Sequence, residues 1–312
     1  MDDVTEAAAS PVQTQRRALC LLNRNARSGD IDPDALSGIF RDAGLDVRIV
    51  GLDDEAPLRS LDDGVDCVIV GGGDGTINGL LPDLLALGRP VGILPLGTAN
   101  DLAGSLGIPR SPEEAAAVIA AGHVRHIDLA DMTATGSDPR LFANVAMVGF
   151  GTNVARAHKG PRKKLLGILA YPLAWLDAYR ESRPFEVRLT IDDRVVEMRA
   201  VQVAVGSGTR HGGGGVVSEK ARHDDGLLWV YYVKPIRWWG WLALIPALFT
   251  GRHRSGGQSE ALSGRRVRLE TGRPLPVAVD GELDGTTPAD FAVRPRALPV
   301  LVPPPEPEPS DR

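Results

Sequence analysis

Short apolar runs alternate with helix-like segments through the first 120 residues of the chain. Four runs rich in Val, Ile and Leu have the character of buried strands; they are residues 18–23, 46–51, 66–72 and 91–97. Residues 76–88 and 111–122 have the spacing of helices, and each ends at a glycine. Alternating strands and helices build a parallel sheet with helices on both faces. We therefore predict an α/β fold that begins with a doubly wound parallel-sheet domain.

Beyond residue 140 the pattern becomes one of strands. The predicted strands alternate or are rich in β-branched residues, and Gly, Asp or Pro bounds them. They are residues 141–150, 185–193, 195–206, 227–233, 265–270, 275–282 and 297–303, with helical segments at 165–180 and 236–249. We predict domains at 16–134 (α/β) and 135–303 (a β sandwich). Residues 1–15 and 304–312 are polar or rich in Pro and Glu, which predicts disorder.

Composition narrows the class of protein. A net charge of −5 disfavours a nucleic-acid partner, because such proteins usually carry a basic domain. Cys20 and Cys67 lie within apolar runs, which predicts buried thiols and no disulfide framework. The first residues lack the apolar core of a signal peptide, and no apolar run reaches 18 residues. These observations favour a cytoplasmic protein.

The strongest local signal is VIVGGGDGTINGLL, residues 68–81, where a strand runs through glycines into a helix. Glycines let the backbone approach phosphate oxygens, and the helix N-terminus adds partial positive charge. Asp74 beside a phosphate would be repulsive unless a divalent cation joined them, which indicates Mg²⁺-nucleotide chemistry. Taken alone, the loop is equally compatible with an ordinary turn in which Asp74 caps a helix.

Two further loops should meet this one. GILPLGTANDLAGSLGIP, residues 92–109, forms the next strand–loop–helix unit, and LLNRNARSG, residues 21–29, follows the first strand. Parallel strands place their carboxyl ends on one edge of the sheet, so the three loops should face one crevice. The sequence therefore predicts a ligand site at this edge.

These motifs resemble a known family. GGDGT at residues 72–76 and PLGTAND at 95–101 closely resemble the diacylglycerol kinase catalytic family, and the nearest branch is the bacterial soluble lipid kinases (diacylglycerol kinase B and YegS-like). The resemblance spans roughly residues 17–303 and implies an ATP-dependent lipid kinase with an NAD kinase/phosphofructokinase-like first domain and a lipid-binding second domain. It implies that the nucleotide is held by Asn23, Gly72, Gly73, Asp74, Gly75, Thr76, Asn78 and Thr98.

The resemblance also implies catalytic and metal residues in the second domain. The DGE motif falls at Asp280 to Glu282, whose two carboxylates would supply the general base. Two residues apart beyond an apolar strand, they are expected on one side of it, where one pKa should be raised. A hairpin turn with solvated acids is the alternative. A structural Mg²⁺ would be held by the Asp225 carboxylate with backbone oxygens of Arg222 and Leu227, although HDDG also reads as a plain hairpin turn.

The acceptor is less well defined by the sequence. Basic residues 162–164 precede one apolar helix and three tryptophans between 238 and 241 flank another, which suits peripheral contact with a membrane as much as an ordinary core helix. Family tendency suggests a homodimer. The lipid itself stays open among diacylglycerol, a sphingoid base, phosphatidylglycerol and other alcohols. An NAD kinase and a non-catalytic nucleotide- or lipid-binding protein stay open as alternative functions.

Overall fold

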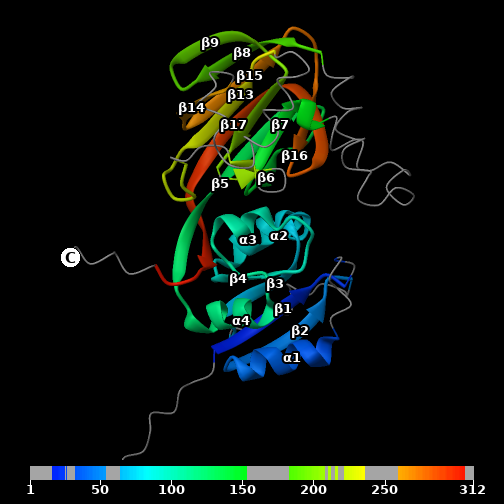
Figure 1. Ribbon diagram of the computed structural model, residues 1–312, viewed down its shortest axis with the longest axis vertical. Coiled ribbons are helices and arrows are strands. Elements are labelled where there is room, and N and C mark those ends of the chain that lie inside the picture. Colours follow the sequence, from blue (N-terminus) through cyan, green and yellow to red (C-terminus); the bar gives the residue numbers. More distant parts are fainter. Residues whose placement is uncertain are drawn as a thin grey trace, which may run out of the picture.

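The computed structural model describes residues 16–24, 26, 32–53, 64–152, 183–207, 210–211, 215–216, 221–235 and 259–305. These residues form an α/β lobe and a β-rich lobe, stacked along the long axis of the molecule (Figure 1). The predicted fold class is therefore confirmed.

The sheet of the α/β lobe is parallel and runs in the order β2-β1-β3-β4. Its strands are β1 (Arg16–Leu22), β2 (Leu45–Gly51), β3 (Cys67–Gly72) and β4 (Val91–Pro95). Its helices are α1 (Pro33–Asp42), α2 (Asp74–Leu87), α3 (Asp101–Ser105) and α4 (Pro112–Ala121). Helices α1 and α4 cover one face, and α2 and α3 cover the face turned towards the β-rich lobe (Figure 1). Covered on both sides, β3 and β4 are buried throughout.

Local sequence explains where these helices begin and end. The side chains of Asp32 and Ser111 accept backbone N–H groups at the starts of α1 and α4, and each helix opens with a proline. Helices α2 and α4 end at Gly88 and Gly122, both in the left-handed conformation that glycine adopts without strain.

The β-rich lobe is a sandwich of two layers around an apolar core. One layer contains β14 (Ser259–Gly264), β13 (Leu228–Val233), β10 (Gln202–Gly206), β7 (Val145–Gly149) and β16 (Pro276–Val279). The other contains β9 (Arg194–Ala200), β8 (Phe185–Ile191), β15 (Arg266–Thr271), β17 (Glu282–Leu301), β5 (Val124–Thr135) and β6 (Arg140–Phe142). A short pair, β11 (Arg210–His211) and β12 (Gly215–Val216), lies apart.

Two segments predicted as single strands are each divided in the structure. Residues 141–150 give β6 and β7, and residues 195–206 give β9 and β10. At each break the chain passes between layers, because β6 pairs with β5 while β7 pairs with β10 and β16. Likewise β9 pairs with β8, whereas β10 pairs with β7 and β13. The sequence does not reveal this change of layer, because the run of strand-forming residues continues across each break although β9 is largely exposed and β10 is buried.

Strands β5 and β17 join the two lobes. Their outer parts pack in the sandwich, while Ile127, Leu129, Leu298 and Val300 belong to the core of the α/β lobe. Val300 also pairs in parallel with Val91 of β4. The predicted second domain, residues 135–303, thus includes a strand whose end packs in the first lobe. The apolar run there covers an edge of the first sheet that would otherwise be open.

The two cysteines, Cys20 and Cys67, are buried as predicted, and burial raises the pKa of their thiols to about 12 and about 11.

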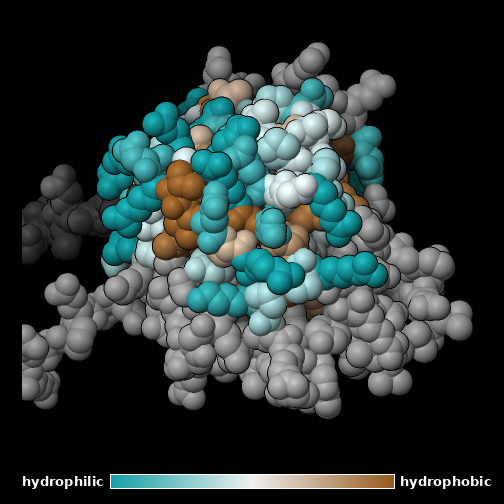
Figure 2. Space-filling view, turned by 90° about the horizontal axis from the view of Figure 1, so that it is seen from above, coloured by the Kyte–Doolittle hydropathy of each residue, from teal (hydrophilic) through white to brown (hydrophobic). Residues whose placement is uncertain are grey.

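The described surface and helices bear on membrane contact. No helix in the described ranges is long and apolar enough to cross a bilayer. Seen from the end of the β-rich lobe, hydrophilic side chains surround a small apolar patch (Figure 2). The predicted helices at 165–180 and 236–249, with their basic and tryptophan residues, lie outside the described residues, as do 1–15 and 306–312.

Candidate active site

Loops from the ends of β1, β3 and β4 meet at one edge of the sheet, where the sequence predicts a ligand site. Asn23, after β1, donates from its Nδ2 to the Oγ1 of Thr76 at 2.8 Å. Gly73 and Gly97 bring the other two loops into direct backbone contact. Thr98, in the loop that follows β4, is exposed. The loops that carry the predicted nucleotide residues therefore meet in one place, whereas Asn78 is buried one turn further along α2. Their binding of a nucleotide stays a prediction.

The glycines of these loops have different roles. A Cβ on Gly97 would lie 2.4 Å from the Cα of Gly73, and one on Gly72 would lie 2.6 Å from the Thr76 side chain. Gly97 is therefore needed for the two loops to pack together, and Gly72 leaves room for the Thr76 side chain at the start of α2. By contrast, a Cβ built on Gly75 meets no atom of another described segment within 4 Å, so the space above this residue is open with respect to that part of the chain.

We expect Gly97→Ala to destabilise the protein by about 3 kcal/mol, because the added methyl collides with backbone that cannot move aside. Chemical denaturation would show this as a lower midpoint with an unchanged slope. Gly104→Ala is the matched control, since its added Cβ meets nothing within 4 Å from other segments that the structure describes. Equal stability of the two variants would contradict the close packing of the loops.

Asp74, the first residue of α2, connects three parts of the site. Its Oδ2 accepts the N–H of Asp101 at 3.0 Å, and its Oδ1 accepts the N–H of Leu102 at 3.0 Å. The carboxylate therefore caps α3 rather than its own helix. Its Oδ1 also accepts Asn144 Nδ2, from the β6–β7 connection, at 3.3 Å. Asp74 thus joins the glycine-rich loop, the PLGTAND loop and the β-rich lobe.

Asn100 holds the PLGTAND loop in shape. It adopts the left-handed conformation, and its Oδ1 accepts the N–H of Gly97 at 2.9 Å. Its Nδ2 donates to the carbonyl oxygens of Gly97 and Pro95 at 2.8 and 3.2 Å. This side chain therefore satisfies the backbone of the turn and sets where α3 begins.

Asp280 belongs to the β-rich lobe, where it lies in the two-residue turn between β16 and β17. Its Oδ1 accepts the N–H of Val145 at 2.8 Å. Its Oδ2 is buried and has no hydrogen-bond partner within the described part of the chain. Burial raises the pKa of the Asp280 carboxyl to about 7; the Val145 amide opposes this and the charge of Asp74 adds to it. A carboxyl with such a pKa can exchange protons near neutrality.

The expectation that Asp280 and Glu282 lie on one side of a strand is wrong. Both turn residues, Asp280 and Gly281, have positive φ, and Val279 pairs with Glu282 across them. The chain reverses between the two carboxylates, as in the tight hairpin turns that Asp-Gly favours. The charge that raises the Asp280 pKa is accordingly that of Asp74, not Glu282.

Glu282 has a different environment, because its side chain is 54% exposed and forms an ion pair with Arg140 at 2.9 Å. Arg140 also contacts Asp284 at 3.1 Å. The hairpin is therefore fastened to β6 through Arg140, and Glu282 is already neutralised by a cation.

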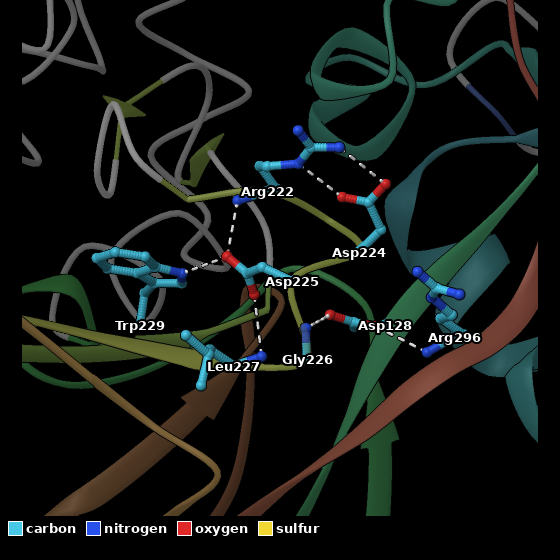
Figure 3. Close-up of polar contacts among 8 residues, drawn as sticks. All are labelled: Asp128, Arg222, Asp224, Asp225, Gly226, Leu227, Trp229 and Arg296. Carbon is cyan, nitrogen blue, oxygen red and sulfur yellow. Dashed lines mark hydrogen bonds and ion pairs between the residues drawn. The ribbon is translucent and has the colours of Figure 1, made fainter.

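The predicted metal residues form a hydrogen-bonded turn before β13 (Figure 3). The Asp225 carboxylate accepts the N–H of Arg222 at 3.1 Å, the N–H of Leu227 at 2.9 Å and the indole N–H of Trp229 at 2.9 Å. Among the described residues, no three His, Cys, Asp or Glu side chains are grouped as a metal site. In the structure, three N–H donors satisfy the Asp225 carboxylate and stabilise the turn. A metal-ligand role for the turn stays a prediction.

Neighbouring bonds attach this turn to the rest of the molecule. Asp128, buried in β5, accepts the N–H of Gly226 at 2.6 Å and the N–H of Arg296 at 2.7 Å (Figure 3). His223 Nε2 lies 2.7 Å from the Oγ of Ser105 in α3. Burial lowers the pKa of His223 to about 4, so its ring is neutral at physiological pH.

Sequence reasoning missed Asn144 and Arg140. Both lie in or beside a run interpreted as one continuous strand, where polar residues give no functional signal. The polar Asn144 within FANVAMV, followed by a change of layer, is the feature that could have drawn attention to this position.

The site thus combines glycine-rich loops at the edge of a parallel sheet with a β sandwich that presents a buried carboxyl. Residues 17–132 match the model of the diacylglycerol kinase catalytic domain, and residues 144–302 match that of the YegS C-terminal NAD kinase beta sandwich-like domain. The chain therefore belongs to the diacylglycerol kinase-like family of lipid kinases, in its YegS branch.

Individual relatives agree with this assignment. The chain is 35% identical to "Probable lipid kinase YegS-like" of Chromohalobacter salexigens over 70% of each protein. It is 32% identical to the protein of that name in Stenotrophomonas maltophilia, over 86% of this chain and 90% of the relative. A crystal structure of a diacylglycerol kinase from Bacillus anthracis superposes with a TM-score of 0.69 at 22% identity, over 93% of this chain and 98% of that one, and shows the shared fold.

Proposed function

We propose that this protein is an ATP-dependent kinase that transfers the γ-phosphate to the hydroxyl group of a diacylglycerol-like lipid. The observation that carries the proposal is Asp280, whose buried Oδ2 lacks a partner among the described groups and whose pKa lies near 7. The relatives named as lipid kinases support it.

In the proposed reaction, Asp280 acts as general base. Its Oδ2 takes the proton of the acceptor hydroxyl, and the hydroxyl oxygen forms a bond to the γ-phosphorus. The bond between that phosphorus and the β–γ bridging oxygen breaks, and the bonding electron pair stays on the oxygen of the departing ADP. Asp74 and Asn144 hold the two lobes together around this point through their 3.3 Å contact.

Asp74 fits a Mg²⁺-nucleotide through a single oxygen. Its Oδ1 already accepts two N–H groups, whereas its Oδ2 accepts one from the described residues and retains room for another partner. Mg²⁺ in nucleotide sites is typically held by one or two carboxylates together with phosphate oxygens. When bound, the ion would neutralise charge that develops on the phosphates. The open space above Gly75, at the N-terminus of α2, suits phosphate oxygens.

We also propose that the enzyme meets its lipid at a membrane surface from the cytoplasmic side, and that it forms a homodimer. Residues 162–164 and 238–241, on which membrane contact would depend, lie outside the described ranges. Their sequence, basic residues and tryptophans beside apolar runs, supports the proposal.

The proposal is tested by incubating the protein with ATP labelled at the γ-phosphate, Mg²⁺ and a panel of hydroxylated lipids, with NAD as a control acceptor. We expect label in a lipid, and its loss when Mg²⁺ is chelated. Label in NAD alone would instead indicate an NAD kinase. Tight ATP binding without transfer to any acceptor would indicate a non-catalytic binding protein.

A further inference from the structure

Asn78 is an unusual residue for the interior of a helix. It lies in α2 with only 6% of its surface exposed. Neither its Nδ2 nor its Oδ1 has a hydrogen-bond partner in the described part of the protein. A buried amide without partners is costly, so such a group in a native protein calls for an explanation.

The direction of Asn78 follows from helix geometry. Residues two apart in a helix point to nearly opposite sides, whereas residues four apart share a face. Asn78 therefore points away from Thr76, which bonds Asn23 on the side of the predicted nucleotide loops. It shares the face of Asp74, which contacts Asn144 of the β-rich lobe.

Two residues beside the strands that α2 packs against also carry unpartnered polar atoms among the described residues. Helix α2 packs against β6 and β17, the strands that flank Asn144 and Asp280. Asn144 is itself buried, and its Oδ1, like the Oδ2 of Asp280, has no partner among the described residues. Asn78, Asn144 and Asp280 together thus offer one unpartnered amide donor group and three unpartnered acceptor oxygens among the described residues.

We propose that Asn78 forms hydrogen bonds with the lipid acceptor rather than with the nucleotide. Resting on the proposed function, this inference assigns Asp280 to the reacting hydroxyl, and Asn78 with Asn144 to a second polar group on the adjoining carbon. An amide that needs both a donor and an acceptor is satisfied by a group that does both. This narrows the diacylglycerol-like acceptor of the proposed function: the preferred lipid carries a hydroxyl or amide, in place of the ester of a diacylglycerol, next to its reacting hydroxyl, as in a monoacylglycerol or a ceramide-like alcohol.

The test compares two acceptors of equal chain length in the same detergent micelles: a monoacylglycerol and a simple long-chain alcohol. Their affinities are measured with a non-hydrolysable ATP analogue and Mg²⁺, for the native protein and for Asn78→Leu. We expect native preference for the monoacylglycerol, and a roughly tenfold smaller preference in the variant, the effect of one or two neutral hydrogen bonds. Affinity for the ATP analogue should not change. Asp83→Asn, on the exposed side of the same helix, is the matched control.

Thermal unfolding of the ligand-free proteins separates recognition from a structural role. Leu in place of an unpartnered buried amide should leave the midpoint unchanged or raise it. A large fall in the midpoint of both Asn78→Leu and Asn78→Ala, equal weakening of both acceptors, or weaker binding of the ATP analogue would overturn the inference. If labelled phosphate reaches no acceptor but the preference is lost in the variant, the proposed kinase activity fails while the inference stands.

Discussion

Asp280→Asn is expected to lower the rate of phosphoryl transfer by about three orders of magnitude, the contribution typical of a general base. The amide preserves the shape of the side chain and can still accept the Val145 N–H, so the hairpin should fold normally. It cannot take the proton of the acceptor hydroxyl. Steady-state assay of lipid phosphorylation, beside a circular dichroism spectrum, measures both expectations.

The pH dependence should change with it. In the native enzyme the base must be ionised, so kcat/KM should rise with pH and level off above an apparent pKa near 7. Because the folded state raises this pKa above its ordinary value, the folded chain holds the proton more tightly than the unfolded chain. Unfolding free energy should therefore decline as pH rises from the ordinary carboxyl range through about 7. Both the rise in rate and this contribution to the decline should disappear in Asp280→Asn.

Glu282→Gln is the matched control for this prediction. Glu282 is exposed and paired with Arg140, so its loss should reduce activity less than about tenfold, in keeping with a surface ion pair. If Glu282→Gln were the more damaging change, Glu282 would be the base, and the proton-transfer role assigned to Asp280 would be wrong.

Gly75→Ala is expected to weaken ATP binding by roughly a hundredfold while leaving the fold intact. Among the described residues nothing outside the helix lies within 4 Å of the added Cβ, so the methyl occupies space that the proposed phosphates need. Alanine also favours helix over glycine by about 0.5–1 kcal/mol, so thermal stability should hold or rise. Calorimetric titration with ATP and Mg²⁺ would show the lower ATP affinity, and thermal unfolding would show an unchanged or higher midpoint.

Gly79→Ala, one turn further along α2, has equally open surroundings and is the control. It should share any gain in stability and bind ATP normally. Unaltered ATP affinity in Gly75→Ala would place the phosphates elsewhere and remove the first turn of α2 from the nucleotide site.

Much of the α/β lobe could be predicted from the sequence, because its signals are local. Buried strands ending in glycine-rich loops fix a parallel sheet, and parallel order brings the loops together whatever the remaining contacts. The gathering of Asn23, Thr76 and Gly97 needed no knowledge of the second lobe.

The chemistry between the lobes was harder to predict, because it depends on contacts across long sequence separations. Asp74 meets Asn144 seventy residues later, and Val145 holds Asp280 at a separation of 135. No local pattern distinguishes Asp280 from Glu282. Only the reversal of the chain at Gly281 turns one carboxylate inward and leaves the other facing Arg140.

The crossing of β17 into the first lobe bears on the order in which the chain can assemble. As the polypeptide leaves the ribosome, β4 has its partner on the β3 side early, but its other side waits for Val300, which is synthesised some two hundred residues later. Until then the edge of β4 is open to pairing with other chains. The end of β17 therefore closes the open edge of β4 last, and neither lobe completes its folding without the other.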